Sequence, residues 1–211
     1  MALAWHPLTP ALIGTVTSLA RAPWDAGGFD QAWLQTGWPT PPGGSVLDFV
    51  KDITNWPVLN IGDWEVTFPW GPWADDARPK MLDLTFALFY EPDEDEDPDW
   101  VELPQTLPSA RWRVDRSGNR EQFNTVWRSG LVTISQVHGK PQDVGVYRDG
   151  DEWSYAIWHM GARLLVLSQG EDFQTHSLYD RATLHIADRP PGSPIPLGGD
   201  LYGLLMGGEG G

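Results

Sequence analysis

Residues 144–168, VGVYRDGDEWSYAIWHMGARLLVLS, decide the fold, because they predict three consecutive β-strands. Asp149-Gly150 separates two strand-like runs, 144–148 and 152–158, and Asp-Gly is a favoured pair for the tight turn of a β-hairpin. Four consecutive apolar residues at 164–167 are typical of a central strand that is covered on both faces. This stretch therefore indicates a hairpin followed by a third, buried strand.

A long helix is predicted immediately before the hairpin. Asn119 and Gln122 have the spacing of a capping box, and Gly139 followed by Pro141 is a typical helix end. The apolar residues between them share one helical stripe: Phe123, Val126, Trp127, Leu131, Ile134 and Val137. After the hairpin, residues 183–187 are expected to supply a last strand.

The first half of the chain repeats the order of helix and then strands. A helix begins at Thr9-Pro10 and runs to about Arg21, and a shorter helix ends at Gly37. The strands predicted here are 64–70 and 82–90, which alternate apolar and polar residues, and the less distinct 46–51.

This order predicts an α+β protein, with a mostly antiparallel β-sheet and two or three helices packed on it. We divide the chain into an N-terminal helix–strands half (1–90), an acidic loop or linker (91–104), a C-terminal helix–hairpin–strands half (105–188) and a Pro/Gly-rich tail (189–211). The halves are either two similar units or parts of one sheet. The tail is expected to be flexible, although its apolar patch at 201–206 offers a docking point.

Composition excludes several classes of function. The chain of 211 residues has 29 acidic and 14 basic residues, a net charge of -15, and only three lysines, which argues against binding to nucleic acid. It has no apolar run of 18 residues that would cross a membrane. The absence of cysteine excludes disulfides, thiolate nucleophiles and zinc fingers. Since the first residues lack the pattern of a secretory signal, we expect a cytoplasmic protein.

Two segments are candidates for binding a protein partner. Seven carboxylates lie between Glu91 and Asp99, and they either steer a basic partner or form a solvated linker. Trp70 and Trp73 lie among turn-forming residues, and they either anchor an interface or cover the edge of the core. The partner-binding residues predicted from these segments are Trp70, Trp73, Glu94, Asp95, Glu96 and Asp97. By contrast, the tryptophans at 33, 64, 127 and 153 fall on apolar stripes and are expected in the core.

No catalytic residue, cofactor site or metal site is predicted. The sequence has no Gly-x-Ser-x-Gly, Ser-x-x-Lys or phosphate-binding glycine motif. None of the five histidines has the spacing of a metal-binding pair, and a site formed by His176, His185 and Asp188 is weaker than the alternative of isolated surface histidines.

Short patterns in both halves resemble uncharacterised actinobacterial proteins that are similar to immunity proteins of secreted-toxin systems. They are Leu19 to Asp25 (LARAPWD) with Phe29, Trp33 and Gly37-Trp38, and later Phe123, Trp127, His138 to Pro141 (HGKP), Trp153, Trp158 and Leu164 to Leu167. The resemblance implies a small acidic α+β module that neutralises a toxin by binding it, with no catalytic residues. The long acidic loop and the glycine-rich tail depart from that pattern.

We therefore expect a non-enzymatic binding protein, an immunity factor that occludes a basic partner. Acidic groups would pair with the partner's basic site, and loop aromatics would supply the buried anchors. The alternatives are an enzyme that binds a small ligand in a Trp-lined cleft and a structural or chaperone-like component of a phage or secretion system. The oligomeric state is left open.

Overall fold

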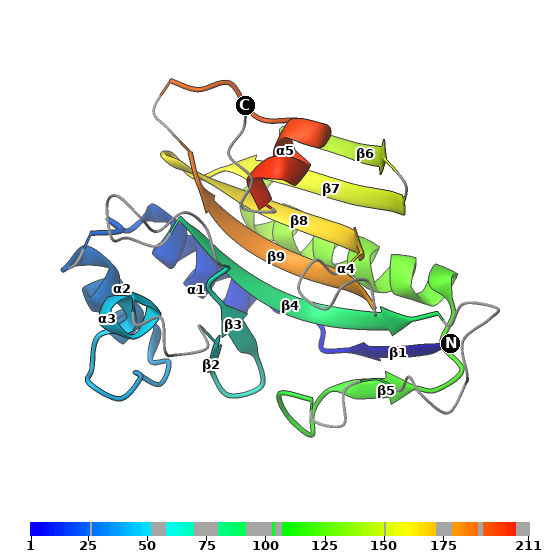
Figure 1. Cartoon of the computed structure of the whole chain (residues 1–211), viewed down its shortest axis with the longest axis horizontal. Helices are drawn as coiled ribbons and strands as arrows, with labels where there is room; N and C mark the ends of the chain where they lie inside the picture. The colour runs from blue at the N-terminus through cyan, green and yellow to red at the C-terminus, as the bar shows by residue number, and fades with distance from the viewer. Residues whose placement is uncertain are drawn as a thin grey trace.

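The computed structural model describes residues 1–25, 27–51, 58–69, 80–91, 103, 107–149, 151–171, 179–189 and 192–205. In these residues a nine-stranded antiparallel sheet carries five helices, which confirms the predicted α+β class (Figure 1). The strands are β1 (Ala2–Trp5), β2 (Val58–Asn60), β3 (Glu65–Thr67), β4 (Met81–Tyr90), β5 (Arg113–Asp115), β6 (Asp143–Asp149), β7 (Asp151–His159), β8 (Arg163–Glu171) and β9 (Asp180–Asp188). The helices are α1 (Pro10–Arg21), α2 (Gly28–Thr36), α3 (Val46–Lys51), α4 (Arg120–His138) and α5 (Gly199–Leu205). None of the described helices is both long and apolar enough to cross a membrane.

The described strands of both halves of the sequence form one sheet. Its main path has the order β2-β3-β4-β9-β8-β7-β6, and β1 lies between β4 and β5. β4 joins the two halves, because one of its edges pairs with β9 while the other pairs with β3 and β1. The predicted hairpin is confirmed, since all of β6 is paired with residues 151–157 of β7.

The largest core lies between one face of the sheet and helices α1, α2 and α4. Leu84, Leu167 and Leu184 point to this face from neighbouring strands, and Phe123 of α4 is buried against it. The four tryptophans expected in the core are buried as predicted: Trp33, Trp64 and Trp127 lie here, and Trp153 lies in a second cluster.

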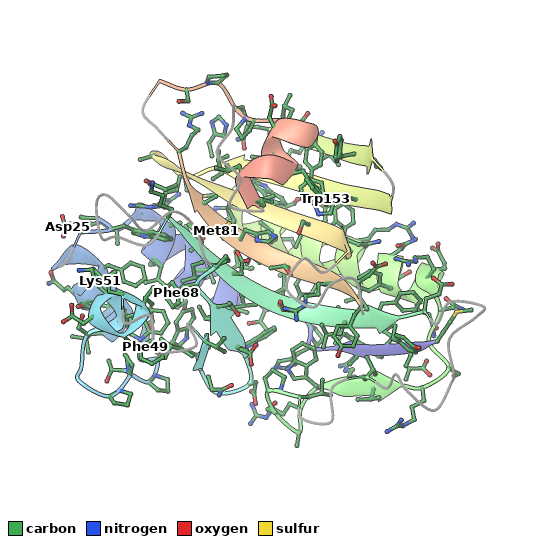
Figure 2. All side chains as sticks on the ribbon, in the orientation of Figure 1. Asp25, Phe49, Lys51, Phe68, Met81 and Trp153 are labelled. Atoms are coloured by element: carbon green, nitrogen blue, oxygen red, sulfur yellow. The ribbon has the colours of Figure 1, made fainter. Side chains whose placement is uncertain are left out.

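The opposite face of the sheet carries that second cluster under α5. Leu201 of α5 is fully buried and packs with Trp153 and Ile157, and Figure 2 shows Trp153 beside this helix. The tail therefore contains a packed helix, where the sequence predicted flexibility with an apolar docking patch. A third cluster, at the other end of this face, contains Leu88 and Trp112. Buried polar side chains lie between the two apolar clusters, and we refer to Asp83, Ser168, Thr183 and His185 as the polar band.

Residues 46–51 form helix α3, so the strand predicted there is wrong. The reason is a pair of N-terminal caps that the apolar pattern does not reveal. Ser45 Oγ accepts a hydrogen bond from the backbone N–H of Asp48 at 3.1 Å. Asp30 Oδ1 accepts one from the N–H of Val46 at 2.8 Å, although it lies 16 residues earlier. These bonds satisfy donors at the start of a helix and favour helix over strand.

The start of α4 gives a direct test of capping. Asn119 accepts a hydrogen bond from the N–H of Gln122 at 3.0 Å, and the Gln122 side chain accepts one from the N–H of Asn119 at 2.8 Å. We expect Asn119→Ala to lower the free energy of unfolding by about 1 kcal/mol, because the backbone N–H of Gln122 loses its side-chain acceptor. Urea denaturation measures the change. Asn119→Ser should retain most of the stability, and equal losses in the two variants would contradict the capping role.

Candidate functional site

The partner-binding residues predicted from the sequence all lie outside the described residues: Trp70, Trp73, Glu94, Asp95, Glu96 and Asp97. Their roles as anchors and steering charges stay predictions. The described part of the chain offers other features, which are an open sheet edge, a buried polar network and two hollows.

One surface combines an open sheet edge with exposed apolar side chains. β6 is the last strand on its side of the sheet, and within the described ranges its second edge has no paired strand. Val144 and Val146 lie on the same face of β6, and each is 53% exposed. Val132 of α4, on the same side of the sheet, is 56% exposed. We refer to these three valines and the unpaired edge of β6 as the edge surface.

The edge surface is hollowed between α4 and β6. A shallow groove of about 580 Å³ is lined by Leu131, Val132, Ser135, Gln136, Lys140, Pro141 and Val144. An unpaired edge presents backbone N–H and C=O groups to which another chain can add a strand. Clustered exposed apolar side chains mark sites of protein association. This surface is therefore suited to an extended segment of another protein.

His185 is buried, so the prediction of isolated surface histidines is wrong for this residue. Its side chain points from the central strand β9 to the polar band, and the residue is only 8% exposed. His6 is half-buried and stacks on Trp64, with ring centroids 4.3 Å apart. Burial lowers the pKa of His6, and nearby arginines lower it further while Asp63 opposes them. His159 is exposed as predicted, and His176 lies outside the described residues.

His185 links three strands through hydrogen bonds on both ring nitrogens. Its Nδ1 lies 2.7 Å from Oδ1 of Asp83 on β4, and its Nε2 lies 2.7 Å from Oγ of Ser168 on β8. All three side chains are buried. Sequence reasoning missed this network because Asp83 and His185 are 102 residues apart and only the register of β4 against β9 places them opposite each other.

The order Asp83–His185–Ser168 is that of a nucleophilic triad, but its surroundings differ from those of an acyl-transfer site. Ser168 is 4% exposed and lies within β8, which is paired along both edges at this residue. The backbone N–H groups beside Ser168 therefore serve the sheet and do not form an oxyanion hole. We assign the network a structural role, in which it holds β4, β9 and β8 together.

Of the three residues considered for a metal site, His176 lies outside the described residues, and Asp188 and His185 contact different partners. The carboxylate of Asp188 lies 3.5 Å from the Nε of Arg163, whereas His185 contacts Asp83 and Ser168. Across the described ranges no group of three or more His, Asp or Glu side chains is placed to hold a metal ion.

Comparison with known proteins gives no match: no protein-family model, no curated protein and no solved structure matches the chain. The functional conclusion therefore rests on the charge, surfaces and side-chain geometry of the chain itself.

Proposed function

We propose that the chain is a non-enzymatic binding protein that occludes a basic protein partner, as an immunity factor occludes a toxin. The observation that supports this proposal is the edge surface, which is open and apolar on a chain of net charge -15. A protein interface combines an apolar centre that loses its water with complementary charge around it. The edge surface supplies the apolar centre, and the acidic residues supply the charge.

The partner would bind in two stages. Long-range attraction to the acidic chain would bring a basic partner close and raise the association rate. An extended segment of the partner would then pair with β6 and cover Val144 and Val146, while Trp70 and Trp73 would add aromatic anchors. The bound chain would then block the basic site of the partner, and this inhibition requires no catalytic residue in the chain.

A double substitution tests the edge surface. We expect Val144→Asp with Val146→Asp to weaken capture of the basic partner from extracts of the source organism at least tenfold. Two added carboxylates would strengthen a purely electrostatic attraction, so a loss of capture isolates the apolar contact. Quantitative mass spectrometry of the captured proteins measures the effect.

The matched control is Val114→Asp on β5, where the valine is 47% exposed and far from β6 in the sheet order. This variant should retain the partner. Equal capture by the double variant and the control contradicts the proposal, and so does the absence of any stoichiometric basic protein from the unaltered chain and both variants.

Neutralising the acidic loop tests the steering charges. We expect the combined substitution of Glu94→Gln, Asp95→Asn, Glu96→Gln and Asp97→Asn to slow association with the captured partner about tenfold at low salt. The rate should also depend less steeply on salt, because screening acts on the charges that were removed. Stopped-flow kinetics over a salt series measures both effects. Unchanged kinetics would assign these residues to a solvated linker.

A further inference from the structure

A second hollow lies between α4 and strands β1, β4 and β5, apart from the edge surface. Its volume is about 580 Å³, within the range of small-molecule sites. We propose that this cleft binds a small amphipathic monocarboxylate, with its hydrocarbon part on the apolar lining and its carboxylate on Arg113. The proposal concerns a ligand site and is independent of the proposed protein partner.

The lining of the cleft is apolar and well supported. Trp5, Pro7 and Val126 are partly exposed in it, and Leu8 and Phe86 are buried beneath them. Gly130 allows α4 to pack closely here, since a Cβ atom at this position would lie 3.3 Å from both the Leu8 Cδ1 and the Phe86 Cζ. This close packing holds the cleft in shape before a ligand arrives, which favours binding.

Arg113 supplies the cationic group of the cleft. It lies directly opposite Trp5 in the pairing of β5 with β1, and its guanidinium carbon is 6.0 Å from the centroid of the Trp5 ring. Within the part of the chain that the structure describes, the side chain of Arg113 has no ion pair or hydrogen bond. The acidic residue of the same lining, Glu121, is engaged by Arg128 at 2.7 Å. The charge of Arg113 is therefore available to an anion.

The charge balance selects the class of anion. A guanidinium binds carboxylate and phosphate groups through the same pair of N–H donors. One arginine on a chain of net charge -15 compensates a single negative charge better than the double charge of a phosphate monoester. The apolar lining adds the requirement for a hydrocarbon part. A monocarboxylate with an aliphatic or aromatic tail meets both conditions.

Calorimetric titration of the full chain with octanoate, octylammonium and octanol tests the proposal. We expect octanoate to bind at least tenfold more tightly than octylammonium, because only the carboxylate pairs with Arg113. Arg113→Gln should weaken octanoate binding about tenfold and leave octanol binding unchanged. Ser129→Phe, which places a ring in the cleft from the exposed side of α4, should abolish binding of both.

Two controls separate this site from other binding. Arg111→Gln removes a neighbouring guanidinium that pairs with Asp63 at 2.8 Å, and it should leave octanoate binding unchanged. The Val144→Asp, Val146→Asp variant should also bind octanoate normally, even if it has lost the protein partner. Thermal unfolding confirms that each variant is folded. Absence of octanoate binding to the unaltered chain, or equal binding by Ser129→Phe or Arg113→Gln, overturns the proposal.

Discussion

Replacing Arg163 with methionine is expected to lower the free energy of unfolding by about 3 kcal/mol. Arg163 of β8 is 6% exposed and holds the C-terminal end of α1 against the sheet. Its Nη1 donates hydrogen bonds to the carbonyl oxygens of Ala20 at 2.9 Å and Ala22 at 2.7 Å. The guanidinium also lies 4.4 Å from the centroid of the Trp24 ring and 3.5 Å from the carboxylate of Asp188.

Methionine occupies a similar volume but donates no hydrogen bond. The carbonyl oxygens of Ala20 and Ala22 then lose a buried hydrogen-bond donor and Asp188 loses one cation, and the loss of these buried interactions carries the cost. Arg163→Lys should lose less, because it keeps the charge while giving up the planar pair of donors. Urea denaturation followed by far-UV circular dichroism gives the difference in unfolding free energy.

Arg128→Met is the matched control for Arg163→Met. Arg128 pairs with Glu121 at 2.7 Å, but the two side chains are 56% and 69% exposed. Exposed ion pairs contribute little, so the unfolding free energy should change by less than about 0.5 kcal/mol. Methionine and arginine have similar helix propensities, so α4 itself is not weakened. If the two variants unfolded at the same urea concentration, Arg163 would not stabilise the contact between α1 and the sheet.

The second large effect is expected at His185. His185→Leu should lower the free energy of unfolding by about 3 kcal/mol, because it leaves the buried side chains of Asp83 and Ser168 without the imidazole between them. Ser168→Ala, which removes one hydroxyl and keeps the contact of His185 with Asp83, should cost about 1 kcal/mol. Chemical denaturation at neutral pH measures both variants.

His159→Leu is the control, since His159 lies on β7, two strands from β9, with an exposed side chain. Its unfolding free energy should change by less than about 0.5 kcal/mol. A small loss for His185→Leu, comparable with that of His159→Leu, would show that the three-strand network contributes nothing to stability.

The elements with strong local signals could be predicted from the sequence. The capping box at Asn119 and Gln122 fixes the start of α4, and the Asp149-Gly150 pair in the sequence predicts the hairpin that β6 and β7 form. The short strands β1 and β5 could not be predicted, because they have four and three residues and are held by pairing with β4 and with each other. Tertiary pairing decides such segments, and local preference does not.

The edge surface and the cleft could not be predicted from the sequence, because both depend on tertiary strand pairing. The edge surface exists because β6 ends the sheet, and strand order cannot be read from periodicity. The cleft around Arg113 gathers residues of β1, β4, β5 and α4, which only the register of β1 between its neighbours brings together. Net charge is a functional signal that the sequence carries alone, because it needs no knowledge of where the residues lie.

The position of β4 between β9 and the strands β3 and β1 has a consequence for when the chain folds during synthesis. Met81 of β4 pairs with Ala187 of β9, so synthesis must pass residue 187 before this pair can form. Until then the apolar strand β4, almost entirely buried in the finished protein, lacks the neighbour that covers one of its edges. Pairing between distant segments slows folding and prolongs exposure to aggregation. We therefore expect the nascent chain to fold late and as one unit, after residue 188 has left the exit tunnel.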